Sequence, residues 1–177
     1  MQQRIAKSQK TANHLIHKEK QSSLKTKNTA SNTHPEISII HWLGGTTHVK
    51  QEIHSDFDLI KVSMAGITKA SIDALTQYLG ISKKNMAEGV LDLSVKTLER
   101  KEPNDILDKK TSSHALEIAK VLQHAFEVFE DEQKVKQWLN RGNRALNGST
   151  PVQLLNTLTG INMVNDILTR IEEGIYS

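Results

Sequence analysis

The chain contains no cysteine and no long hydrophobic run, and aromatic residues are few. Without cysteine it can form neither a disulfide framework nor a reactive thiolate, and such a composition fits a reducing cytoplasm. No stretch approaches the roughly 20 apolar residues that a membrane-spanning helix needs. Because aromatic residues make up only 4% of the sequence, the core has to be built from Leu, Ile, Val, Met and Ala. The 177 residues suffice for one medium core or two small modules.

Positive charge is concentrated at the start of the chain. Residues 1–35 carry seven basic side chains against the single acid Glu19, a net charge of +6, and since the whole chain carries +3 the remainder carries −3. The overall basicity is therefore a poor argument for nucleic-acid binding by the rest of the chain. This basic tail is rich in Lys, Ser, Gln, Thr and Asn. We expect it to be disordered, either as a solvated tail or as a non-specific electrostatic arm.

Helix signals cover the chain from residue 56 onward, whereas residues 36–55 are predicted to be extended or irregular. Pro35 and Gly44 bracket "EISIIHWL", whose β-branched residues favour a short strand or extended segment. Beyond it, Ser, Thr and acidic residues stand where helices begin, and Gly or Pro where they end. The helices predicted in this way span residues 56–65, 69–79, 83–91, 95–101, 113–129, 132–140 and 161–175. The fold class is therefore mainly α.

The stretch "RALNGSTPVQLL" predicts a helix stop, a turn and a helix start. Gly142 is placed to end the preceding helix in a left-handed conformation, and Asn147-Gly148 is a turn dipeptide. Thr150 precedes Pro151, which suits the first position of a helix, and Gln153 completes a capping box. In the helix that follows Gly160, a seam of apolar residues predicts packing against the other helices: Ile161, Val164, Leu168, Ile171 and Ile175.

The segment "GISKKNMAEGVLDLSVKTLERK" has the layout of a helix-turn-helix. A short helix with Ala87 at its packing face is followed by a turn and by a helix that Ser94 caps, with Val95 and Leu98 turned inward. The side chains placed to contact bases or phosphates are Lys83, Lys84, Ser94, Lys96, Thr97, Arg100 and Lys101. The turn "LDLS" lacks the glycine usual in such units. The competing interpretation is a pair of small core helices with solvated lysines.

The sequence carries no pattern for catalysis or metal binding. It has no glycine-rich phosphate loop, no G-x-S-x-G elbow and no H-E-x-x-H. His41, His48 and His54 are spaced seven and six apart, which matches no metal-ligand signature. We therefore expect no metal, no cofactor and no enzymatic activity. Trp138 is either a core residue or an anchor for a partner protein.

A set of motifs in the second half of the chain is shared with a known family. They are "AFEVF", the pair Trp138-Leu139, "NRALNGSTPVQLL", Gly160 and the closing "LTRIEEGIYS". With them the chain resembles the toxin-binding domain of Xre/MbcA/ParS-type antitoxins, which show an N-x-A-L-x-G-x-x-P turn and end in an R-I-x-x-G helix. "SVKTLERK" stands where that family has a Ser-x-x-Thr-Leu-x-Arg recognition helix, so the resemblance extends over residues 56–177.

The resemblance implies a cytoplasmic bacterial antitoxin of type II. It would have an Xre-like helix-turn-helix domain at residues 56–110 and a toxin-binding helical domain at residues 111–177. Its partner would be a RES-domain toxin that consumes NAD or transfers ADP-ribose, whose active site the antitoxin occludes. The complex would bind its operator DNA as a homodimer and repress its own operon. The residues expected at the toxin are Trp138, Arg144, Arg170, Glu173, Ile175 and Tyr176.

The residues leave a second function open, a helix-turn-helix transcriptional regulator that has no toxin partner. This hypothesis depends on Arg100 and its basic neighbours as DNA contacts. Neither hypothesis involves a membrane or a metal ion.

Overall fold

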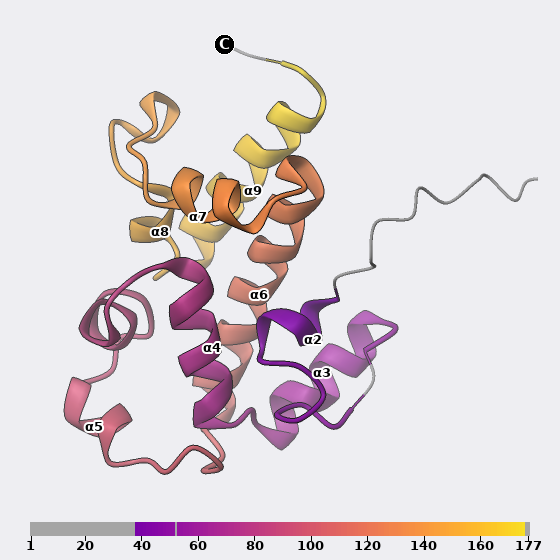
Figure 1. The fold of residues 1–177 in the computed structure, drawn as a ribbon, viewed down its shortest axis with the longest axis vertical. Coiled ribbons are helices and arrows are strands. Elements are labelled where there is room, and N and C mark those ends of the chain that lie inside the picture. The colour runs from indigo at the N-terminus through magenta and orange to yellow at the C-terminus, as the bar shows by residue number, and fades with distance from the viewer. Residues whose placement is uncertain (1–37, 52, 176–177) are drawn as a thin grey trace, which may run out of the picture. The chain divides into compact units, whose positions relative to one another are not determined.

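The longest helix of the structure is α6, Lys109–Phe129, and several other helices pack against it (Figure 1). The computed structural model describes residues 38–51 and 53–175, and residues 37–177 cluster as one compact unit. The helices in contact with α6 are α2, Ile39–Trp42; α3, Asp56–Ala65; α4, Lys69–Leu79; α7, Glu132–Leu139; and α9, Leu158–Glu172. The predicted mainly α class is confirmed for the described residues. The expected disorder of the basic tail lies outside them.

The remaining elements of this part of the chain are short. They are η1, a π-helix at Asn85–Val90; α5, Val95–Glu99; η2, a 3₁₀-helix at Arg144–Leu146; and α8, Pro151–Leu154. The helix predicted over residues 83–91 is thus mostly a π-helix, in which Leu91 N–H donates to the carbonyl of Met86 at 2.9 Å. Thr68 and Ile106 form an isolated antiparallel bridge.

The expected extended segment at "EISIIHWL" is wrong for residues 39–42, which form α2. Ile39, Trp42 and Leu43 have helical spacing, and Trp42 and Leu43 are fully buried. The indole Nε1 of Trp42 donates to Gln123 on α6 at 2.9 Å, and its ring lies 5.0 Å from that of Tyr78. Packing against α4 and α6 therefore overrides the strand propensity of the β-branched residues.

The start of α6 lies four residues before the predicted Ser113. Asp108 caps it, accepting hydrogen bonds from the Thr111 N–H at 3.0 Å and the Thr111 hydroxyl at 2.7 Å. These hydrogen bonds hold the pKa of the Asp108 carboxyl below its ordinary value. Ser112 is buried, and its hydroxyl accepts from the Ile67 N–H at 3.0 Å. The first turn of α6 is polar in sequence although Ser112 is buried, because the Ser112 hydroxyl satisfies the backbone N–H of Ile67 in a neighbouring segment.

Several predicted helix boundaries agree with the structure. Thr68 caps α4 by accepting from the Ser71 N–H, and Gly80 ends that helix at φ 69° in the left-handed region. Ser94 caps α5 in the same way, through the Thr97 N–H. However, α5 ends at Glu99, two residues before the predicted end.

The last helix begins earlier than predicted, at Leu158 instead of after Gly160. Thr157 caps it through the Gly160 N–H at 3.0 Å. Gly160 is buried in the first turn, where a Cβ would lie 2.0 Å from the carbonyl oxygen of Leu154. The lack of a side chain at Gly160 therefore permits α8 and α9 to approach closely.

One hydrophobic cluster joins residues from both predicted domains. Val62 on α3 and Leu168 on α9 belong to it, and α6 runs between them as a shared support. The division at residue 110 remains a prediction about which segment meets which partner.

We predict that Gly160→Ala destabilises the protein by about 1–3 kcal/mol, since the new methyl group meets a backbone carbonyl that cannot turn aside. The measurement is the midpoint and slope of urea unfolding. Gly89→Ala is the matched control because nothing lies within 4 Å of its added Cβ. Equal unfolding free energies for the two variants would contradict the proposed close approach.

Candidate functional site

A groove of about 310 Å³ opens between the ends of α6, α7 and α9 and the loop that follows α7. Its walls are mainly apolar, with one cationic side chain. The lining residues are Phe129, Trp138, Asn143, Ala145, Ile167, Arg170, Ile171 and Ile175. The end of α6, α7 and η2, which follow one another along the chain, and α9 thus contribute to one concave surface of a size suited to a few side chains of a partner.

Trp138 forms the aromatic part of this groove together with Phe129. The two ring centroids lie 5.5 Å apart with an interplanar angle of 45°. Trp138 is half-buried, packs against the hydrophobic core and also lines the groove. Trp138 can therefore be both a core residue and an anchor for a partner protein.

The loop after α7 forms one wall, and Asn143 organises it. The Asn143 carbonyl accepts from the Gly148 N–H at 2.9 Å, its N–H donates to Ser149 at 3.0 Å, and its side chain accepts from the Ala145 N–H at 2.9 Å. The predicted turn is present, with Asn147 at φ 54° and Gly148 at φ 84°. These bonds hold Ala145 at the edge of the groove.

Of the two predictions for the positions that flank this turn, the helix stop at Gly142 is wrong and the capping box at Thr150 is confirmed. Gly142 does not end α7 in a left-handed conformation, because Asn140 caps the helix at φ −101°. A Cβ at Gly142 would instead lie 2.8 Å from the Gly148 carbonyl oxygen, so glycine allows the loop to fold back on itself. The capping box of α8 is confirmed, with the Gln153 side chain accepting from the Thr150 N–H at 2.9 Å.

The end of α9 brings Arg170 and Ile175 to the groove. After Glu172 the chain turns at Gly174, φ 70°, and the Ile175 N–H donates back to the carbonyl of Arg170 at 2.8 Å. This is the hydrogen bond of a Schellman-type helix end, which places the residue after the glycine against the last turn. Ile175 is 54% exposed, so its apolar side chain is available to a partner.

The other residues predicted to meet the toxin lie elsewhere. Arg144 begins η2 and Glu173 follows α9; both are exposed, and neither lines the groove. Tyr176 lies outside the described residues. The sequence reasoning did not predict the remaining lining residues, which are Phe129, Asn143, Ala145, Ile167 and Ile171, although Ile171 belongs to the apolar seam predicted in the last helix.

A second candidate surface is the helix-turn-helix segment formed by η1, α5 and the turn between them. The turn lacks glycine, but Asp92 adopts the left-handed conformation there, with φ 54°. Aspartate tolerates this region better than most residues with a side chain. The structure thus supplies the left-handed position that the sequence "LDLS" left in doubt.

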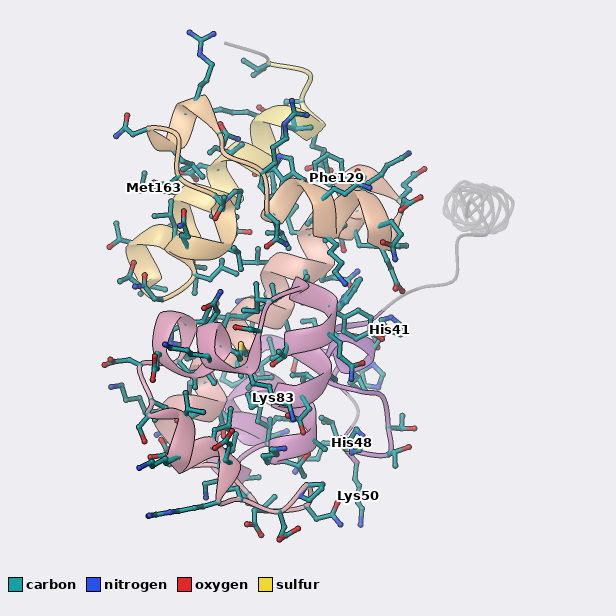
Figure 2. The ribbon with its side chains drawn as sticks, turned by 60° about the vertical axis from the view of Figure 1, so that its left-hand side comes forward. His41, His48, Lys50, Lys83, Phe129 and Met163 are labelled. Carbon is teal, nitrogen blue, oxygen red and sulfur yellow. The ribbon has the colours of Figure 1, made fainter. Side chains whose placement is uncertain are left out.

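Most residues predicted to contact DNA are exposed on this segment. Lys83, Lys84, Ser94, Lys96, Thr97 and Arg100 are exposed, and Lys101 is half-buried. The hydroxyls of Ser94 and Thr97 lie 2.8 Å apart and hydrogen bond to each other. Because α5 ends at Glu99, Arg100 caps the helix and does not extend from its face. Figure 2 shows Lys83 and Phe129 on different parts of the body, so the two candidate surfaces are separate.

The histidines of the described residues make ordinary polar contacts. His41 lies 3.1 Å from Glu132, His114 Nε2 lies 2.6 Å from the Leu155 carbonyl, and His124 Nδ1 lies 3.1 Å from Asn165. Within residues 38–51 and 53–175, no group of three or more His, Asp or Glu side chains is placed to hold a metal ion. In the same residues, no helix has both the length and the apolar character needed to cross a membrane.

Displaced pKa values do not point to catalysis at the groove. Hydrogen bonds from Lys61 and Ser55 lower the pKa of Asp58 to about 2, and burial, with Glu132 nearby, raises the pKa of the Tyr78 hydroxyl. Neither residue lines the groove. The concave surface of the groove thus carries apolar and aromatic side chains together with Arg170.

Comparisons with known proteins identify the segment that forms this groove. Residues 124–174 match the family described as the antitoxin Xre/MbcA/ParS C-terminal toxin-binding domain. A protein named Antitoxin Xre from Photorhabdus laumondii subsp. laumondii is 36% identical over 67 residues, which cover 37% of this chain and 45% of that protein. A protein of the same name from Pseudomonas putida is 27% identical over 125 residues, 70% of this chain and 76% of that protein. The chain thus spans less than half the length of the first of these relatives.

Residues 124–174 are therefore similar to the C-terminal toxin-binding domain of antitoxins of the Xre/MbcA/ParS type. The family consists of antitoxins and not of enzymes, in agreement with the expectation from the sequence. All lining residues of the groove except Ile175 fall within the matched segment. The aligned stretch of 125 residues is longer than this domain, so it also includes helices that precede residue 124.

Proposed function

We propose that the protein neutralises a toxin of a type II toxin–antitoxin system by direct binding through the groove. The observation that carries the proposal is the convergence of Trp138, Arg170 and Ile175, three residues predicted as toxin contacts from the sequence, on one concave surface. A half-buried aromatic ring, an exposed aliphatic side chain and an arginine are the residue types that dominate protein–protein binding energies. The groove holds no assembled set of catalytic groups, which suits an inhibitor.

The partner that we propose is a RES-domain toxin that consumes NAD or transfers ADP-ribose. This choice rests on the family resemblance, in which antitoxins of this type pair with such toxins and occlude their active sites. Arg170 suits the role because a guanidinium can form paired hydrogen bonds with carboxylates, such as acidic side chains at a nucleotide site. The exposed apolar side chain of Ile175 beside it would exclude water from the contact.

We further propose that the helix-turn-helix segment binds operator DNA and represses the operon of the antitoxin, as a homodimer within the bacterial cytoplasm. Its exposed Lys83, Lys84, Lys96 and Arg100 support phosphate contacts. A dimer would present two such segments to two half-sites. The alternative function, a DNA-binding regulator without a toxin, draws on the same surface and leaves the groove without a role.

Toxin binding is expected to depend on the rim of the groove. We predict that Arg170→Ala and Ile175→Glu each weaken binding to the purified toxin by at least about tenfold, because each removes a side chain that lines the groove. The measurement is the dissociation constant by titration calorimetry, together with protection of cells that express the toxin.

Arg141→Ala and Leu158→Glu are the matched controls for this test. Arg141 is exposed and Leu158 is 66% exposed, and neither lines the groove. If the controls weaken binding as much as the groove variants, or if the groove variants bind like the original protein, the assignment of the groove is wrong.

DNA binding is expected to depend on the basic residues of the helix-turn-helix. Arg100→Ala should weaken binding to the operator and lower the slope of log affinity against log salt by about one unit, since one phosphate contact is lost. Lys134→Ala, an exposed cation on α7, is the control and should leave both quantities unchanged. Operator affinity that survives Arg100→Ala with an unchanged salt slope would remove this residue from the DNA surface.

A further inference from the structure

Helix α3 presents a row of large apolar side chains to solvent. Phe57 is 76% exposed, Ile60 53% and Met64 66%. Their spacing of three and four residues places them on one face of the helix. Leu59 and Val62 lie on the opposite side and pack into the hydrophobic core. The helix is therefore apolar on two faces, and only one of them is covered by the described residues.

A hollow runs beside this row, between α3 and α6. It has a volume of about 240 Å³, and its walls combine apolar and charged side chains. The lining residues are Asp56, Leu59, Ile60, Ser63, Ser113, Leu116, Glu117 and Lys120. When two helices pack together, the ridge of side chains on one helix fits into a groove beside the ridge of the other, and α3 presents both a ridge and a groove.

We propose that this α3 face binds the same face of a second copy of the chain, with the two α3 helices antiparallel and a two-fold axis near Ile60. The inference rests on the homodimer proposed above and assigns its interface. It differs from the toxin contact, because neither α3 nor its hollow contributes a residue to the groove of α7 and α9.

The order of residues in the row favours a second copy as the occupant. Phe57 stands three residues before Ile60, and Met64 stands four residues after it. In an antiparallel pair, Ile60 of one copy therefore faces Ile60 of the other, and Phe57 of each copy lies beside Met64 of the other. Thioether sulfur atoms make favourable contacts with aromatic rings. The surface is thus complementary to itself, as a two-fold interface requires.

The charges on α3 select the antiparallel orientation. Asp56 and Asp58 lie in its first turn, and its last turn carries neither acidic nor basic residues. Lys61 donates to the Asp58 carboxylate at 2.9 Å, so one of the two acidic side chains of this turn is paired within its own helix. A parallel pair would bring the acidic turns of both copies together, whereas an antiparallel pair separates them and places each beside a turn without charged side chains.

The exposed area is sufficient for a moderate association. The three side chains expose on the order of 400 Å², within the range of about 300–600 Å² that the largest apolar patch of a soluble monomer covers and that is often functional. This is about half of the 800 Å² that each partner contributes to a standard interface. The walls of the hollow beside α3 supply further area, so we expect a dimer that dissociates at roughly micromolar concentrations.

The first experiment measures the mass of the full chain by analytical ultracentrifugation, without toxin or DNA. The original protein should be dimeric at roughly 100 µM and dissociate on dilution, and Ile60→Glu should be monomeric under the same conditions. Leu158→Glu places the same charge on an equally exposed apolar position of α9 and should remain dimeric. A monomeric original protein, or a dimer that persists in Ile60→Glu, would overturn the proposal.

A second experiment uses the lack of cysteine in the chain. Ile60→Cys introduces a single thiol at the proposed axis, so mild oxidation should convert the protein to a covalent dimer. A mixture of Phe57→Cys and Met64→Cys should cross-link between the two variants more than either does alone. Leu158→Cys is the control, and cross-linking of this variant as fast as of Ile60→Cys would refute the interface.

The circular dichroism of each variant shows whether its fold is retained, and the cysteine variants keep the test valid if Ile60→Glu does not fold. Toxin affinity separates this inference from the proposed function. Ile60→Glu should bind the toxin as the original protein does, so a loss of dimer formation alone leaves the groove assignment intact. Weak toxin binding by Arg170→Ala, with dimer formation unchanged, would support both the groove assignment and the separate dimer interface on α3.

Discussion

The packing of α6 against helices on several of its sides is the constraint on which the rest of the structure depends. Ala115, Ala119 and Ala125 are fully buried on this helix and let the neighbouring backbones approach, while Ile118 and Leu122 fill the space between them. Burial of each such aliphatic side chain contributes about 1.5–3 kcal/mol. Because α3, α7 and α9 all rest on α6, the position of this helix determines both the groove and the exposed α3 face.

The elements that carry the candidate surfaces occupy different parts of one body (Figure 1). The groove is built from α6, α7 and α9, the basic residues lie on η1 and α5, and the exposed apolar row lies on α3. The three proposed partners, a toxin, DNA and a second copy of the chain, would therefore bind without competing for the same residues. In the proposed function, one copy would hold a toxin and contact DNA at the same time, and α3 would join the two copies.

Local sequence signals predicted much of the fold, but less of the site. Caps and glycine stops are local, so the starts and ends at Thr68, Gly80, Ser94 and Thr150 follow from neighbouring residues alone. The helix at residues 39–42 depends on the burial of Trp42 against α6, which no local pattern contains. Trp138, Arg170 and Ile175 were expected as toxin contacts from the family motifs. The position of Phe129 in the groove could not be predicted in this way, because it depends on the packing of α6 against α9, which are far apart in sequence.

The central claim is that the protein acts by fitting the groove of its toxin-binding domain onto a toxin. Amide hydrogen exchange of the full chain, with and without the proposed toxin partner, tests this claim most directly. The account predicts slower exchange in residues 138–146 and 170–175 when the toxin is bound, with exchange in α5 unchanged. A tight complex in which these two segments exchange as fast as in the free protein would contradict it.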